Sequence, residues 1–214
     1  MKIGILGTGD VGKALGHAFV KLGHEVQMGS RKAGNEKAAQ WVNAAGKKAS
    51  SGTFAEAAKF GEIVVLATLG EASENAIKLA GPENLKGKLV IDTTNPLDFS
   101  KGMPPSMFVG TTDSLGERIQ RAAPGAHVVK AFNTVGNAHM FKPDFPGGPP
   151  DMFICGDSED AKKKMSALLK DFGWGVVDIG GISSSRWLEP MCLTWVLHGI
   201  KSNSWNHAFK LLKK

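Results

Sequence analysis

Short apolar runs alternate with segments of helical periodicity along the chain. The runs predict buried strands at residues 3–6, 24–28, 62–67, 88–92, 127–132, 152–155 and 175–179. The periodic segments predict helices after Gly12 and at residues 35–46, 54–60, 69–79, 115–123 and 157–172, then a helical tail at 183–212 that Pro190 is expected to kink or restart. A run without polar positions, such as Ile63 to Leu66, is typical of a strand covered on both faces of a sheet.

Strands that alternate with helices predict an α/β fold, here a Rossmann-type, doubly wound, mainly parallel sheet with a C-terminal helical tail. The 214 residues suit a single domain spanning 1–214, with 183–214 as the tail. Residues 50–53 form a short polar segment, and residues 97–112 and 137–151 are expected to be loops. The ligand crevice of such a sheet lies at the carboxyl ends of its strands.

The first strand ends in a Gly-x-Gly-x-x-Gly motif, Gly7 to Gly12, and a helical pattern follows it. Strand, glycine turn and helix are the context that makes this motif a dinucleotide-binding signature. Gly7 permits the tight turn, Gly9 lets a pyrophosphate approach the backbone, and Gly12 lets the helix pack closely on the strand. Asp10 lies inside the turn, and we expect it to point away from the phosphates and cap nearby backbone N–H groups.

The end of the second strand distinguishes NAD from NADP. An NAD site usually has an acidic residue there, which binds the ribose hydroxyls. This chain instead has Ser30, Arg31 and Lys32. An acid would repel a phosphate on the ribose, whereas a hydroxyl and a guanidinium bind it. The sequence therefore predicts NADP as the cofactor.

Composition narrows the class of protein. Hydrophobic content of 42% and charged content of 21% are ordinary for a globular domain. The net charge is +6, but the basic residues are spread along the chain and are not interleaved with aromatic residues, so no nucleic-acid partner is expected. Cys155 and Cys192 form no paired motif, and no apolar run is long enough to cross a membrane. We expect a cytoplasmic protein without a membrane partner. The six histidines have no metal-ligand spacing, so no metal is expected.

With these residues in view, the chain resembles the NADP oxidoreductases that depend on the deazaflavin coenzyme F420. It is also similar to the cytosolic reductase domain of six-transmembrane ferric reductases. The most specific matching stretches are VVKAFNTVG at 128–136 and VVDIGGISSSRWLEP at 176–190. Others are KIGILGTGDVGKALG at 2–16, GSR at 29–31, IVVLAT at 63–68, IDTTNPL at 91–97 and MFICGD at 152–157.

The resemblance implies a cofactor-binding role for residues at several strand ends. Thr8 to Val11 would cover the pyrophosphate, and Ser30 with Arg31 the ribose phosphate. Relatives often have a further basic residue just beyond this pair, and here Lys32 or Lys37 would have to replace it. The path from adenosine to nicotinamide would be lined by Ala67, Thr68, Leu69 and Asn95. The nicotinamide and the second coenzyme would lie beside Ala131, Phe132, Asn133, Thr134 and Val135.

The predicted function is hydride transfer between NADPH and a flavin-like acceptor, either coenzyme F420 or a flavin, without a catalytic acid or base. Lys130 and Asn133 have the spacing of a catalytic pair, but we expect Lys130 to be structural or adjacent to the cofactor. One alternative is an NADPH-dependent reductase of a small carbonyl, imine or quinone. The other is a non-catalytic NADP-binding sensor, and solvent access at Thr134 and Val135 would argue against it.

The C-terminal segment concentrates large apolar residues that one compact domain would struggle to bury. We therefore expect a homodimer that uses this segment; the alternative is that the same residues cover the chain's own sheet. An ion pair between Arg186 and Glu189 is expected to fix the tail. The large apolar residues in question are Trp187, Met191, Trp195, Trp205, Phe209 and Leu212.

Overall fold

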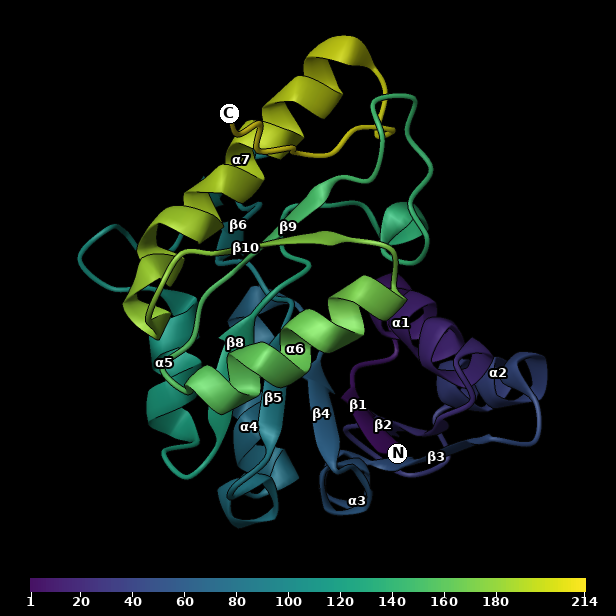
Figure 1. The fold of residues 1–214 in the computed structure, drawn as a ribbon. Helices are drawn as coiled ribbons and strands as arrows, with labels where there is room; N and C mark the ends of the chain where they lie inside the picture. The colour runs from purple at the N-terminus through teal and green to yellow at the C-terminus, as the bar shows by residue number, and fades with distance from the viewer.

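The computed structural model describes all of residues 1–214 and is built on a six-stranded parallel sheet (Figure 1). The strand order is β3-β2-β1-β4-β5-β8, the order of a doubly wound dinucleotide-binding sheet. The predicted fold class is therefore confirmed. The strands are β1 (Lys2–Leu6), β2 (Glu25–Ser30), β3 (Ala49–Thr53), β4 (Ile63–Leu66), β5 (Leu89–Asp92) and β8 (His127–Lys130).

Helices cover both faces of this sheet because its strands carry apolar side chains on both sides. Ile63 and Val65 of β4 belong to one core, whereas Val64 and Leu66 belong to the other. The first core includes residues of α1 (Asp10–Lys21), α2 (Glu36–Ala45) and α6 (Glu159–Asp171). The second includes residues of α3 (Phe54–Phe60), α4 (Ser73–Ala80) and α5 (Leu115–Ala122).

The central strand β1 lies at the switch point of the sheet. It pairs with β2 on one side and with β4 on the other, so that Ile5 lies between Met28 and Val65. The strand order reverses at this point, and in doubly wound sheets the ligand crevice lies outside the carboxyl ends of the strands at such a switch point, here β1 and β4. The glycine turn after β1 and the segment after β4 meet at this edge.

Two expectations about the sheet are wrong. The polar segment at 50–53 belongs to strand β3, which pairs with β2 from Val26↔Ala49 to Ser30↔Thr53. Because β3 is an edge strand with no partner on its outer side, it needs little apolar character. The runs at 152–155 and 175–179 form a separate parallel pair, β9 (Asp151–Ile154) with β10 (Gly175–Asp178). This pair meets the main sheet at one bridge, between Lys130 and Cys155.

The predicted loops are largely irregular. The first contains a short antiparallel pair, β6 (Leu97–Asp98) with β7 (Ser106–Met107). Single 3-10 turns occur at η1 (Gly70–Ala72), η2 (Pro82–Leu85), η3 (Asn137–His139) and η4 (Ile182–Ser184). Helix α3 has the predicted bounds, because Thr53 and Glu56 form a capping box at its start.

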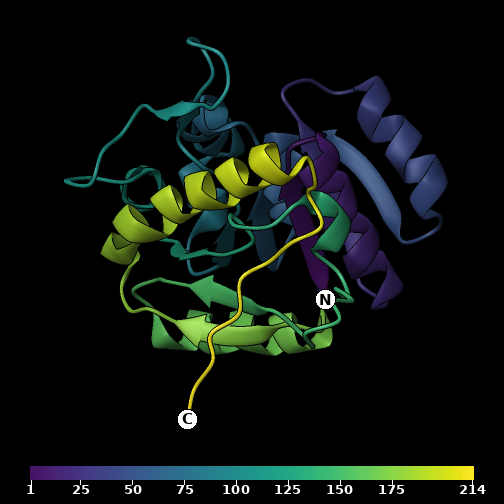
Figure 2. The same cartoon turned by 90° about the horizontal axis from the view of Figure 1, so that it is seen from above.

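The tail is helical only in part. Helix α7 (Ser185–Ser202) runs through Pro190 without interruption and ends where Asn203 adopts a left-handed conformation, with φ of +48°. The prediction that the helix continues to residue 212 is therefore wrong. The chain then turns back, and the N–H of Asp151 donates to the carbonyl of Phe209 at 2.9 Å. In Figure 2 this last segment passes over β9 and β10.

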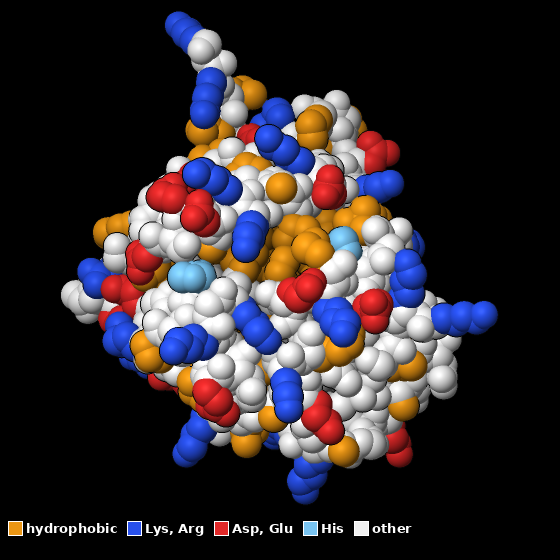
Figure 3. Space-filling model, turned by 60° about the horizontal axis from the view of Figure 1, so that its bottom comes forward, with side chains coloured by type: hydrophobic (Ala, Val, Ile, Leu, Met, Phe, Trp, Pro, Cys, Tyr) orange, Lys and Arg blue, Asp and Glu red, His pale blue; other side chains and the backbone are white.

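Two features bear on membrane and nucleic-acid partners, namely the apolar length of the helices and the distribution of charge on the surface. No helix of the chain combines the length and the apolar character needed to span a bilayer. On the face shown in Figure 3, basic and acidic side chains are interspersed, and no patch of like-charged side chains is seen there. Hydrophobic side chains gather in a hollow near the middle of that face.

Candidate functional site

The glycine turn after β1 has no room for side chains at two of its three glycines. Gly7 has φ of +138°, and a Cβ there would lie 2.1 Å from the carbonyl oxygen of Ala67. A Cβ on Gly12 would lie 2.5 Å from the carbonyl oxygen of Gly7. A Cβ on Gly9, in contrast, would meet nothing within 4 Å. The turn is thus closely packed against backbone atoms at Gly7 and Gly12 and is open at Gly9.

The backbone N–H groups of this turn are free. From Thr8 to Gly12 none donates a hydrogen bond within the chain, and no side chain caps the 12-residue helix α1. The cap expected from Asp10 is wrong: its side chain is 82% exposed and lies 4.0 Å from Nζ of Lys13. Its expected orientation away from the phosphates stays a prediction. Free N–H groups at the positive end of a helix dipole fit an anion such as a pyrophosphate.

The end of β2 presents a hydroxyl and two cations. Ser30 is buried, and its hydroxyl donates to the carbonyl of Lys32. Arg31 and Lys32 are exposed, and neither forms a salt bridge. No acidic residue stands between Ser30 and the helix cap Asn35. The edge of the sheet at β2 therefore suits a phosphate rather than two ribose hydroxyls.

The ends of β4 and β5 are held against one another at this same edge. A Cβ on Gly70 would lie 2.0 Å from the carbonyl oxygen of Asn95, so only glycine allows this approach. The Thr68 hydroxyl lies 3.0 Å from that of Ser73. Leu69 is 70% exposed, a large apolar side chain that nothing in the chain covers. Ala67 is buried, whereas Thr68 and Asn95 are half-buried.

The segment after β8 is more enclosed than the sequence suggested. Phe132 has φ of +63°, and its ring packs in the core with a centroid 5.7 Å from that of Phe172. Its side chain therefore does not reach the crevice. Ala131 and Asn133 are also buried, and Thr134 and Val135 are only 4% and 8% exposed. The solvent access that would mark room for a second ring at Thr134 and Val135 is not present.

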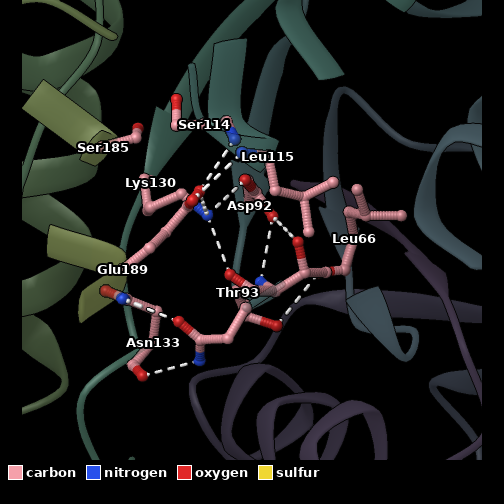
Figure 4. Close-up of polar contacts among 12 residues, drawn as sticks. Leu66, Asp92, Thr93, Ser114, Leu115, Lys130, Asn133, Ser185 and Glu189 are labelled. Carbon is pink, nitrogen blue, oxygen red and sulfur yellow. Dashed lines mark hydrogen bonds and ion pairs between the residues drawn. The ribbon is translucent and has the colours of Figure 1, made fainter. Parts of the chain in front are cut away.

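Two asparagines join the ends of β5 and β8. Nδ2 of Asn95 donates to the carbonyl of Asn133 at 2.8 Å, and Nδ2 of Asn133 donates to Oδ1 of Asn95 at 3.0 Å. Nδ2 of Asn133 also donates to the carbonyl of Leu188 in α7, at 2.9 Å. These bonds fix the backbone on both sides of the crevice (Figure 4). The predicted position of Asn95 at the crevice is consistent with this placement.

Lys130 lies at the centre of a buried ionic cluster (Figure 4). Its Nζ is 2.7 Å from Oδ2 of Asp92 and 3.1 Å from Oε1 of Glu189, and it donates to the carbonyl of Thr94 at 2.8 Å. All three charged side chains are at most 1% exposed. Burial alone would lower the pKa of Lys130, but the two carboxylates outweigh it and raise this pKa above its ordinary value. This pairing supports a structural role for Lys130, and whether it is structural or adjacent to the cofactor stays a prediction.

Asp92 was not singled out from the sequence, and Glu189 was not expected to bind Lys130. The signal that was available is Lys130 itself, because a lysine ending an apolar strand must find carboxylate partners when it is buried. The expected pair of Arg186 with Glu189 is wrong. Arg186 instead binds Glu117 of α5 through two N–H···O bonds of 2.8 and 2.6 Å. This frees Glu189 to bind Lys130 and the start of α5.

The arrangement offers binding groups but no free acid or base at the ends of β5 and β8. Asp92 and Lys130 are the titratable side chains there, and both are fully buried and paired. Cys155 and Cys192 are free and buried, and burial raises the pKa of the Cys155 thiol to about 11. No group of three His, Cys, Asp or Glu residues is placed to hold a metal.

Comparison with known proteins gives one consistent family. Residues 2–96 match the family described as NADP oxidoreductase, coenzyme F420-dependent. An F420-dependent NADP reductase of Methanothermobacter marburgensis is 31% identical over 229 residues, which cover 99% of this chain and 98% of that protein. The metalloreductase STEAP3 of Rattus norvegicus is 30% identical over 193 residues, 90% of this chain. The chain spans only 36% of the length of that metalloreductase.

Solved structures agree with this result. A proposed F420-dependent NADP reductase from Arthrobacter sp. FB24 is 40% identical, with a TM-score of 0.94 over 100% of both chains. An imine reductase from Streptomyces aurantiacus is 17% identical, with a TM-score of 0.67 over 94% of this chain and 64% of its own. At that level of identity the likeness shows a common fold only.

Proposed function

This chain belongs to the family of coenzyme F420-dependent NADP oxidoreductases, and on that premise we propose that it transfers a hydride between NADPH and a flavin-like ring, deazaflavin F420 or a flavin. The observation that carries the proposal is the combination of two features at one sheet edge. The N–H groups from Thr8 to Gly12 donate no hydrogen bond within the chain and the turn is open at Gly9, and Ser30 with Arg31 replaces the acid of an NAD site.

The cofactor is assigned to these residues by their chemistry. The N–H groups of Thr8, Gly9, Asp10, Val11 and Gly12 would bind the pyrophosphate through the turn and the α1 dipole. Arg31 would bind the ribose phosphate. The Ser30 hydroxyl, which donates to the Lys32 carbonyl in this structure, would rotate to donate to the same phosphate. Between the ribose phosphate and the nicotinamide, the cofactor would lie along Ala67, Thr68, Leu69 and Asn95.

Hydride transfer to a conjugated ring needs little further help from the protein. When bound, NADPH supplies the hydride, and the chain supplies proximity and a pocket shielded from water. Reduction of a carbonyl would instead require a proton donor within hydrogen-bond reach of the forming alkoxide. All three donor hydrogens of Lys130 are already engaged by Asp92, Glu189 and Thr94. This supports a ring acceptor over the carbonyl and imine alternative.

The acceptor is proposed to lie on the open side of the crevice. Because Thr134 and Val135 are buried, room for a second ring beside them would have to come from movement of the loops. Leu69 is the large apolar side chain that stays exposed at the strand ends, and Phe99 and Phe108 of the neighbouring loop are 53% and 37% exposed. These side chains would cover one face of a planar acceptor.

The experiment that tests the proposed function is NADPH oxidation against a panel of acceptors: deazaflavin F420, flavins, quinones, ferric chelates and cyclic imines. A deazaflavin or flavin should give the highest turnover. Preference for an imine or quinone would favour the small-molecule reductase. NADPH binding without oxidation by any acceptor would favour the sensor.

The outer face of α7 supports a homodimer. Trp187, Leu197 and Ile200 are 66%, 50% and 43% exposed on this helix, whereas Trp195 is buried and packs against Gly136. The tail thus covers its own chain with one face and leaves these three large apolar side chains exposed on the other, among the polar Thr194, His198 and Lys201. We expect a dimer by light scattering at micromolar concentration, and mostly monomer for the double variant Trp187→Glu, Leu197→Glu. The matched control Leu79→Glu, on an exposed site of α4, should remain dimeric. A monomeric wild type would contradict the proposal.

Both free, buried thiols also support a reducing compartment such as the cytoplasm as the place of action. The whole chain, 1–214, is proposed to act as one cofactor-binding unit, because α7 is tied to both β8 and α5 by Glu189 and Leu188.

A further inference from the structure

The buried cluster around Lys130 contains two carboxylates and a single ammonium group. Asp92 contributes from the last position of β5, Glu189 from α7, and Lys130 from the last position of β8. Neither carboxylate touches a second cationic side chain. If both are ionised, this part of the core carries a net charge of about −1, shielded from water by its burial.

Both carboxylates are contacted only by hydrogen-bond donors, as is expected of ionised groups. Oε1 of Glu189 accepts from Gly116 N–H at 2.8 Å and faces Lys130, while Oε2 accepts from Leu115 N–H at 3.0 Å. A proton on either oxygen would have no acceptor among these contacts.

Asp92 shows the same pattern. Its Oδ1 accepts from the N–H and the hydroxyl of Thr94, at 2.9 and 2.7 Å, and its Oδ2 faces Lys130. The positive end of the α5 dipole offsets part of the Glu189 charge, so the cluster stays negative without reaching a full unit.

The cluster lies directly behind the proposed nicotinamide end of the crevice. Asp92 and Lys130 are the last residues of the two strands whose following segments carry Asn95 and Ala131. Nζ of Lys130 donates to the carbonyl of Thr94, the residue before Asn95. Figure 4 shows Asn133 and Thr93 on the same side of the network.

Resting on the proposed NADP site, we propose that this buried negative charge stabilises bound NADP⁺ relative to bound NADPH, and so makes the bound cofactor a stronger hydride donor. The oxidised ring carries a positive charge that the reduced ring lacks. The hydride takes two electrons and one proton to a ring atom of the acceptor, a carbon in a deazaflavin or a nitrogen in a flavin, and the acceptor also takes a proton from water. A nearby fixed negative charge therefore favours the oxidised side.

The test is the ratio of the Kd of NADP⁺ to the Kd of NADPH, measured by titration calorimetry without any acceptor. Asp92→Asn and Glu189→Gln each remove one negative charge while keeping the size of the side chain. Asp113→Asn is the matched control, since Asp113 carries an equal charge near α5 but is solvent-accessible and paired with Arg118 and Arg121.

We expect the ratio to rise roughly three- to thirtyfold in each buried-site variant and by less than twofold in the control. A structural defect would weaken both ligands together and leave the ratio unchanged. A ratio unchanged or lowered in either folded variant overturns the proposal, and a cooperative melting transition shows which variants are folded. Absence of NADPH and NADP⁺ binding by the wild type would instead refute the proposed function.

Discussion

Replacing Lys130 by methionine is expected to lower the free energy of unfolding by about 3–5 kcal/mol. Methionine keeps roughly the length of the lysine side chain but leaves Asp92 and Glu189 buried without their shared cation. One of the two must then take up a proton or draw in water. The measurement is urea unfolding of the wild type and the variant at one pH, compared through their midpoints and slopes.

The same variant should recover part of its stability as the pH falls. Burial raises the pKa of Glu189 even beside Lys130. Without Lys130 that pKa rises further, so the folded variant binds protons that the unfolded chain releases at neutral pH. Stability then falls as pH rises through the folded pKa of Glu189, and the difference from wild type is smaller near pH 5 than at pH 7.

Lys162→Met is the control for this prediction. Lys162 is also buried, but its partners Glu159 and Asp178 are 72% and 41% exposed, so water can solvate them when the lysine is lost. We expect a cost of about 1 kcal/mol or less. Equal losses of unfolding free energy in the two variants would show that burial of Asp92 and Glu189 adds no cost when their lysine is removed. A Lys130 variant that is stable and binds cofactor but loses about a thousandfold in turnover would identify Lys130 as an acid.

Replacing Arg31 by alanine is expected to weaken NADPH binding by roughly tenfold to over a hundredfold and to leave NADH binding unchanged. Arg31 is exposed and forms no salt bridge, so its guanidinium is free to bind a phosphate on the ribose. Its loss removes a charge-assisted contact that NADH, without that phosphate, does not make.

Titration of both cofactors against wild type and variant checks this expectation. Lys47→Ala, beyond the far end of α2, removes an equal charge from the surface and should change neither affinity by more than about twofold. Equal affinity of the wild type for NADPH and NADH would contradict the assignment of the ribose phosphate to Ser30 and Arg31.

Local signals in the sequence predicted the parts of the site that depend on local geometry. The glycine turn is one, because Gly7 and Gly12 must approach backbone atoms closely wherever the turn occurs. Helix α3 is another, since the capping box of Thr53 and Glu56 fixes its start. Pairing over long distances was not predictable. The edge strand β3 is polar and reveals itself only by its pairing with β2.

The partners of individual side chains were the hardest feature to predict from the sequence. Arg186 has Glu189 close by in sequence on the same helix, yet binds Glu117 of α5, and Glu189 turns to Lys130. Helix packing decides this choice, and no local pattern records it. The same holds for Phe132, whose left-handed backbone turns its ring into the core beside Phe172. A strand pattern extended through that residue cannot show the change of direction.

Transfer of a deuterium label tests whether the hydride passes directly from NADPH to a ring acceptor. NADPH deuterated at the transferring position of the nicotinamide would be mixed anaerobically with the protein and deazaflavin F420, and the products analysed by mass spectrometry. Direct hydride transfer predicts one deuterium in the reduced deazaflavin for each NADPH oxidised, and none in water. Deuterium released to water, or NADPH left unoxidised by F420 and flavins alike, would contradict direct hydride transfer to a ring acceptor.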